Sequence, residues 1–356
     1  MKHHITATAA ALAIAATALA GPQTHWLQTT YNFGAFNESE HAVTARFKCV
    51  NTGDEPLVIL AARANCGCTT PRYTPEPVAP GDTATITVAF DPAGRPGRFT
   101  KKVYVDTNTE PQRSTLTITG VVIGTEASIA QRYPVAIGPL KTARNAALLG
   151  TILKGHAKSV FINGYNQSTD TITPTFADAP KWLSVTATPA AVPPGEQMVI
   201  SFFVQPDKTD LYGTVADTVT ITPTPGAQSH RMPVVVTMLE DFGTLTSDQI
   251  AKAPEAKLSQ TTVQLPELTH GVPATQTLTL TNKGKSTLII RRLHSIDQNI
   301  RAQASATKIK PGKSATITIT ATAKADSPTV NSRITLITND PLDPVQTIRI
   351  TGQTKP

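Results

Sequence analysis

The 356-residue sequence has few cysteines, few aromatic residues and no long apolar run. It has 3 cysteines, 2 tryptophans and only 5% aromatic residues. No apolar run approaches the roughly 20 residues of a transmembrane helix. Three cysteines allow at most one internal disulfide. We therefore expect no membrane span, and one thiol left over if a disulfide forms.

Sequence patterns of known catalytic sites are also missing. There is no nucleophile elbow, no His-Glu-x-x-His pattern, no phosphate-binding glycine loop and no evident pair of catalytic acids. The histidines at 156, 230, 270 and 294 are isolated. The net charge of +7 is spread along the chain without a Lys or Arg run. These absences predict a protein that is not an enzyme, needs no cofactor and binds no nucleic acid.

The first 20 residues have the pattern of a secretory signal. A Lys and two His precede an alanine-rich apolar stretch, which ends in Ala18-Leu19-Ala20. Residue 21 is Gly, so the Cys that accepts a lipid anchor in bacterial envelope proteins is absent after the expected cleavage site. We expect an exported protein, located in the periplasm, outside the cell or on its surface.

An internal repeat organises the rest of the chain. Asn-x-Gly, Pro-Gly and Asn positions of the first third recur in the last third at a constant offset of 231 residues. The matched pairs are Asn51 and Asn282, Pro80-Gly81 and Pro311-Gly312, and Asn108 and Asn339. A weaker middle copy has Asn166 and Pro194-Gly195. Repeated units of about 110 residues fit sandwich domains better than solenoid repeats.

Apolar residues alternate with polar ones after each Pro-Gly, as in strands with one buried face. They are Ala84, Ile86, Val88 and Phe90, then Met198, Ile200, Phe202 and Val204, then Ala315, Ile317 and Ile319. We predict an all-β chain of three tandem immunoglobulin-like sandwiches. After the signal at 1–20, the sandwiches span 21–125, 126–240 and 257–356, with a linker at 241–256. The capping-box sequence at 246–249 and Pro254 predict a short helix in this linker.

Cys49 follows an alternating pattern that directs it into the core, and Leu280 holds its position in the third repeat. This pattern favours the interpretation that Cys49 is a small buried hydrophobic residue. If residues 51–56 turned a hairpin, Cys49 would pair near Val58, leaving Cys66 farther along the chain. A disulfide to Cys49 is thus open but less favoured.

Cys66 and Cys68 lie in a loop bounded by Gly and Pro, and Asp297 and Asn299 match them in the third repeat. The fold therefore does not require these two thiols. Four interpretations remain: ligands for a soft metal such as Cu(I) or zinc, a redox or mixed-disulfide site, a short-range bridge, or a local structural loop. A closed zinc site would need two more ligands, and no second Cys pair exists.

The first third resembles a bacterial exported family of unknown function. The resemblance rests on an Asn-Thr-Gly motif at 51–53, Cys-Gly-Cys-Thr at 66–69, Pro-Gly at 80–81, Phe-Asp-Pro at 90–92 and Gly-Arg-Phe at 97–99. It implies an immunoglobulin-like fold akin to major-sperm-protein-type domains. It implies no reaction. Cys49 departs from the bulky apolar residue expected there, which leaves a pairing with the loop open.

Together these patterns predict an exported scaffold that binds a protein or another envelope component through sandwich loops or sheet edges. The alternative is a redox or soft-metal-handling protein that uses Cys66 and Cys68. The sequence specifies neither the partner nor the oligomeric state.

Overall fold

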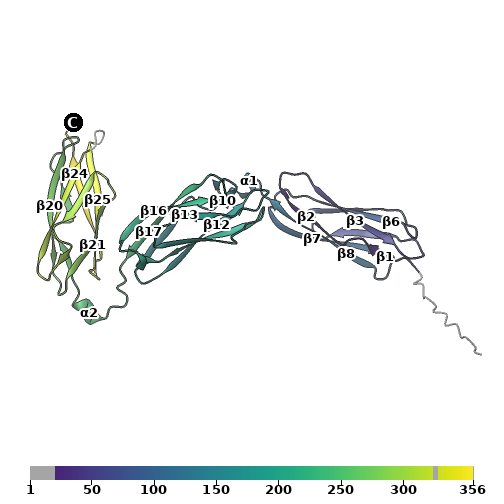
Figure 1. Cartoon of the computed structure of the whole chain (residues 1–356), viewed down its shortest axis with the longest axis horizontal. Helices are drawn as coiled ribbons and strands as arrows, with labels where there is room; N and C mark the ends of the chain where they lie inside the picture. Colours follow the sequence, from purple (N-terminus) through teal and green to yellow (C-terminus); the bar gives the residue numbers. More distant parts are fainter. Residues whose placement is uncertain (1–20, 324–327, 356) are drawn as a thin grey trace, which may run out of the picture. The chain divides into compact units, whose positions relative to one another are not determined.

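Almost all of the regular secondary structure is β-strand, as the sequence predicts (Figure 1). The computed structural model describes residues 21–323 and 328–355. The expected signal at 1–20 lies outside them. Among the described residues, no helix is both long enough and apolar enough to cross a membrane.

Residues 24–142 form two four-stranded sheets, a short helix and two further strands. Their elements are β1 (Thr24–Trp26), β2 (Thr30–Asn37), β3 (Val43–Asn51), β4 (Ile59–Ala64), β5 (Thr69–Tyr73), β6 (Thr83–Phe90), β7 (Gly97–Thr107), β8 (Arg113–Ile123), α1 (Glu126–Ile129), β9 (Val135–Ile137) and β10 (Leu140–Thr142). The sheet orders are β1-β3-β6-β5 and β2-β8-β7-β4.

Residues 147–239 add seven strands and one 3-10 turn. They are β11 (Ala147–Leu153), β12 (Lys158–Asn166), β13 (Thr175–Ala177), β14 (Leu183–Thr188), β15 (Gln197–Val204), η1 (Pro206–Lys208), β16 (Gly213–Thr222) and β17 (His230–Leu239). The sheet orders are β14-β15-β12-β10-β9 and β11-β17-β16-β13.

Residues 247–353 begin with the linker helix and continue with nine strands. They are α2 (Ser247–Ala251), β18 (Ala256–Leu258), β19 (Thr262–Gln264), β20 (Pro273–Asn282), β21 (Leu288–Ser295), β22 (Ile300–Ala304), β23 (Lys308–Ile309), β24 (Ser314–Thr322), β25 (Thr329–Thr338) and β26 (Val345–Gln353). The sheet orders are β18-β20-β24-β22 and β19-β26-β25-β21-β23. The predicted capping box is present: Gln249 N donates to Thr246 Oγ1, and Thr246 N donates to Gln249 Oε1.

The alternating residues after each Pro-Gly are buried in all three repeats, as predicted. One parallel pairing also recurs three times, between β2 and β8, β11 and β17, and β19 and β26. Each repeat therefore has the same parallel strand pair at one edge of a sheet.

A fully buried asparagine fixes the same chain crossing in each repeat. The Nδ2 group of Asn51 donates to Glu55 O at 2.7 Å and to Val78 O at 3.0 Å. Asn166 and Asn282 repeat both bonds with carbonyls four residues and 26 or 27 residues away. Buried polar groups must be hydrogen-bonded, so these asparagines join strand ends that are far apart in the sequence.

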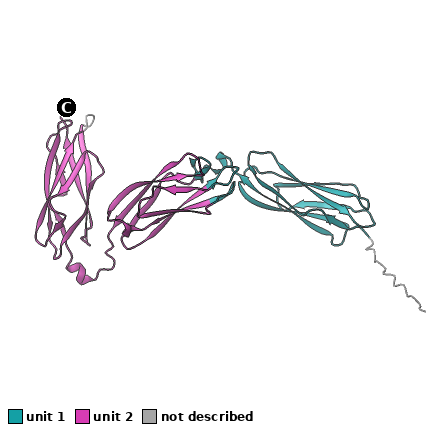
Figure 2. Ribbon diagram, viewed as in Figure 1, with its two compact units in different colours: residues 1–141, 165–172, 191–197 teal, residues 142–164, 173–190, 198–356 magenta. Residues whose placement is uncertain are grey.

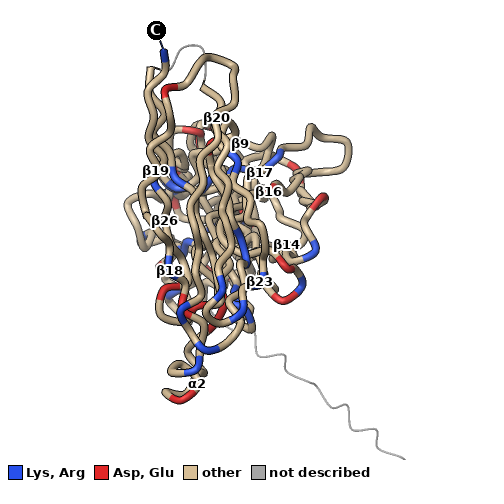
Figure 3. Tube along the Cα trace, turned by 90° about the vertical axis from the view of Figure 1, so that its left-hand side faces the viewer, with Lys and Arg blue, Asp and Glu red and all other residues tan. Residues whose placement is uncertain are grey.

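The described chain divides into two compact units (Figure 2). Of the described residues, unit 1 comprises 21–141, 165–172 and 191–197, and unit 2 comprises 142–164, 173–190, 198–323 and 328–355. These bounds do not follow the repeats, so the division into three sandwiches stays a prediction. Lys and Arg are interspersed with Asp and Glu along the trace (Figure 3).

Candidate functional site

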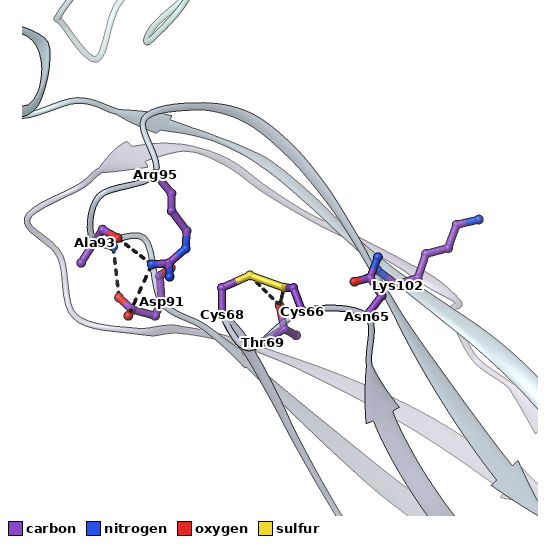
Figure 4. The surroundings of a disulfide bond; sticks show 8 residues. All are labelled: Asn65, Cys66, Cys68, Thr69, Asp91, Ala93, Arg95 and Lys102. Carbon is purple, nitrogen blue, oxygen red and sulfur yellow. Dashed lines mark hydrogen bonds and ion pairs between the residues drawn. A yellow bond between two sulfur atoms is a disulfide. The ribbon is translucent and has the colours of Figure 1, made fainter.

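The loop between β4 and β5 contains the disulfide of the chain. Cys66 and Cys68 are bonded to each other, with their Cα atoms 5.4 Å apart (Figure 4). Both residues are partly buried, and Gly67 between them is exposed. Residues 66 and 68 therefore present a closed disulfide rather than two thiols.

Hydrogen bonds hold this disulfide loop at both ends. Asn65 N donates to Lys102 O at 3.2 Å on strand β7, and Lys102 N donates to the Asn65 side chain at 3.3 Å. Thr69 N donates to Cys66 O at 3.3 Å, and the buried Thr69 hydroxyl lies 3.4 Å from Cys66 Sγ. The loop is a tight turn anchored to a long strand.

The third repeat closes the matching turn without cysteine. Asn299 Nδ2 and Asn299 N each donate to Asp297 Oδ1 at 2.9 Å. Ile300 N donates to Asp297 O at 3.1 Å, which matches the bond from Thr69 N to Cys66 O. A hydrogen bond between side chains thus stands where the first repeat has a covalent bond. The comparison favours a local structural role for the disulfide.

The disulfide loop contacts the loop that joins β6 and β7. Asp91 N donates to Cys68 O at 3.0 Å. The Asp91 carboxylate accepts a hydrogen bond from Ala93 N at 3.0 Å and lies 3.6 Å from Arg95 Nη1, which also donates to Ala93 O at 2.6 Å. Figure 4 shows these residues beside the disulfide. The two loops therefore form one hydrogen-bonded end of the sandwich.

A buried carboxylate ties this end to α1. Glu38, at 7% exposure, accepts hydrogen bonds from Gly94 N and Thr125 N, both at 2.8 Å, and from the Ser128 hydroxyl. Burial by itself raises the pKa of Glu38. The hydrogen bonds from Ser128, Thr125 and Gly94 outweigh burial, so the pKa lies below its ordinary value of 4.5. Glu38 is thus held as an ionised clamp.

Cys49 is a free thiol buried at 1% exposure, in the core position predicted for it. Burial raises its pKa to about 11, so the unreactive thiol form prevails at neutral pH. The hairpin interpretation of residues 51–56 is wrong. Cys49 lies opposite Trp26 and Ala84, and β4 belongs to the other sheet, because the chain crosses between sheets after Asn51.

The structure does not gather metal ligands around the candidate cysteines. Within residues 21–323 and 328–355, no three His, Cys, Asp or Glu side chains are grouped as a metal site would require. Soft-metal binding uses thiolates, and the sulfurs of Cys66 and Cys68 are joined to each other. His294, one of the isolated histidines, is exposed on β21.

Sequence reasoning missed Glu38 and the residues around it. Glu38 lies in an exposed-looking polar stretch, Asn37-Glu38-Ser39-Glu40, and its partners are 56 to 90 residues away. Only the capping position of Thr125 before α1 gives a local signal, since its hydroxyl accepts from Ser128 N.

Two parts of the chain match known protein families. Residues 24–122 match a family described as a protein of unknown function, DUF1573. Residues 254–353 match the HYDIN/CFA65/VesB-like Ig-like domain. Neither match spans half of the chain, and no curated protein matches it.

Several solved structures are similar at low identity. A protein of unknown function from Porphyromonas gingivalis is 19% identical, with a TM-score of 0.46, and the match covers 61% of this chain and all of that one. The ASH/PapD-like domain of human CEP192 is 12% identical over 32% of this chain and 91% of that one, with a TM-score of 0.25.

An endo-fucoidan hydrolase of glycoside hydrolase family 107, MfFcnA4, is 14% identical over 88% of this chain, with a TM-score of 0.28. This chain spans 42% of that enzyme's length. The two family matches show that the first third of the chain is similar to a family of unknown function and the last third to an Ig-like domain.

Proposed function

We propose that the chain is an exported, non-enzymatic scaffold that binds a protein or another envelope component. The observation that carries the proposal is the construction of the loop end of the first repeat. There a disulfide, two adjoining loops and the Glu38 clamp fix the backbone. Elsewhere in the same repeat, the one free thiol, Cys49, is buried in the core. Loops held on a rigid frame are suited to recognition.

Export is part of the same proposal. The signal-like sequence at 1–20 supports it, and so does the disulfide, because disulfides persist in oxidising compartments. We place the mature protein in the periplasm or at the cell surface.

The redox or metal-handling alternative receives less support. It needs Cys66 and Cys68 as reactive groups, whereas the third repeat builds the same turn with Asp297 and Asn299. Because a hydrogen bond replaces the disulfide in the third repeat, closure of the turn is enough to explain the disulfide in the first.

Cross-linking of the full-length protein in its producing cells tests the proposal. A photo-reactive residue is placed at Ala93 in the loop between β6 and β7, and at Lys181, an exposed loop residue, as control. We expect one protein or envelope component to be cross-linked from position 93 and not from 181, in the periplasmic or surface fraction. Equal labelling from both positions, or recovery only from the cytoplasm, would contradict it.

A further inference from the structure

A cavity of about 520 Å³ opens beside the loop between β6 and β7. One wall consists of residues 94–97, and the other of residues 128–129 and 131–133, from α1 and the turn after it. Tyr165 and Gln197 complete the lining, and all of these residues belong to unit 1. Binding cavities commonly have volumes of roughly 300 to 1,000 Å³.

Two stacked tyrosines belong to the lining of this cavity. The rings of Tyr133 and Tyr165 have centroids 5.5 Å apart at an interplanar angle of 24°. They pack with Ile129, and both are nearly buried, at 6% and 3% exposure. Tyr165 Oη also accepts a hydrogen bond from Gly124 N at 2.8 Å. The tyrosine part of the lining is therefore largely apolar and fixed in position.

The Glu38 carboxylate holds the two walls of the cavity together. It binds Gly94 N on one wall and the Ser128 hydroxyl on the other. The Gly94 wall is continuous with Asp91, whose backbone N–H is bonded to Cys68 O in the disulfide loop. The cavity is thus pre-formed, which lowers the entropic cost of binding.

The cavity lining carries positive charge only. Arg95 and Arg132 contribute guanidinium groups, Gln131 and Gln197 contribute carboxamides, and no Asp or Glu belongs to the lining. Arg132 is exposed and makes no ion pair with any residue that the structure describes.

The acidic groups nearby are already engaged. Both carboxylate oxygens of Glu38 accept hydrogen bonds. Glu196 pairs with Arg98 at 2.6 Å, and Glu126 lies 3.6 Å from Lys141 Nζ. Arg95 is partly compensated by Asp91, at 3.6 Å, so Arg132 is the principal unpaired charge at the cavity.

We propose that this cavity binds an acidic segment of a partner protein, with a carboxylate on Arg132. The proposal rests on the interaction function proposed above and names its site and the chemistry of its partner. A guanidinium pairs with carboxylates through two parallel hydrogen bonds. The carboxamides of Gln131 and Gln197 are suited to the donors and acceptors of a peptide backbone.

Calorimetric titration of the full-length protein with a hexaglutamate peptide at low salt tests this site. We expect saturable binding that is weakened about tenfold by Arg132→Ala, the loss of one charge-assisted hydrogen-bonding group. Gln131→Glu, which adds a negative charge to the lining, is expected to weaken it similarly. Arg63→Ala removes an exposed arginine of unit 1 outside the cavity and should leave the affinity unchanged.

Absence of saturable hexaglutamate binding, or equal losses in Arg132→Ala and Arg63→Ala, would overturn the assignment. Circular dichroism of each variant shows whether it has folded. The outcome is separable from the broader proposal: a partner cross-linked from position 93 equally well in Arg132→Ala would leave the interaction function standing and would remove this cavity as its site.

Discussion

At the scale of single residues, the disulfide of the first repeat corresponds to a side-chain hydrogen bond in the third, which indicates that its role is to close a turn. Cys66 and Cys68 and the pair Asp297 and Asn299 occupy equivalent positions, and both pairs close the same turn. A disulfide closing so short a loop constrains the unfolded chain only weakly, by about 1.5 kcal/mol in the chain-entropy model. Its contribution is local order rather than a large share of stability.

The variant Cys66→Asp/Cys68→Asn transfers the third-repeat pair into the first repeat. We expect it to lose less than about 1 kcal/mol of unfolding free energy, because the hydrogen bond replaces most of the turn closure. Cys66→Ala/Cys68→Ala, which has neither link, should lose about 1.5 kcal/mol. Urea denaturation measures both values. Equal losses in the two variants would show that Asp and Asn do not substitute for the disulfide.

Glu38 predicts a dependence of stability on acid pH. Its pKa is lower in the folded protein than the ordinary value of 4.5, so its stabilising effect is full above that value. The effect is lost as the pH falls through the lower pKa of the folded state. Glu38→Gln should cost about 1 to 3 kcal/mol at pH 7 and flatten this part of the profile. Denaturation at a series of pH values from neutral to acid tests this; a parallel profile in the variant would contradict it.

At the scale of strands and turns, the sequence predicted the buried strands and the equivalence of the repeats. Period-two alternation identified the buried strands after each Pro-Gly, because a half-buried strand must alternate. The constant offset identified Asn51 and Asn282 as equivalent. It could not show their role, since each amide bonds a carbonyl 27 residues away. The error at residues 51–56 has the same origin: local turn signals do not reveal which sheet the next strand joins.

Gly53 marks the point where the segment before β1 crosses the turn after β3. A Cβ there would lie 2.1 Å from Gly21 O and 2.7 Å from Gln23 N. We expect Gly53→Ala to cost about 2 to 3 kcal/mol, because backbone atoms must move. Gly67→Ala is the matched control, since a Cβ at 67 has no neighbour within 4 Å. Thermal unfolding compares the two, and equal midpoints would show that the crossing adapts freely.

At the scale of the whole molecule, the chain combines a repeated fold with features that occur in one unit. The buried asparagine recurs in all three repeats, whereas the disulfide, the Glu38 clamp and the tyrosine-lined cavity lie together in unit 1. The cavity could not be predicted from the sequence, because its lining residues, 94–97, 128–129, 131–133, 165 and 197, follow no common spacing. Its arginines are also indistinguishable by pattern from other surface arginines.

In the function proposed above, the chain acts by binding a partner, and the Cys66–Cys68 disulfide closes a turn. Quantitative cross-linking from position 93 in cells, comparing wild type with Cys66→Asp/Cys68→Asn, tests it most directly. We predict the same partner in the same yield from both proteins. Loss of that partner from the variant, together with a covalent complex of the wild type that forms without irradiation and is released by a thiol reductant, would contradict this and indicate a redox function for the cysteines.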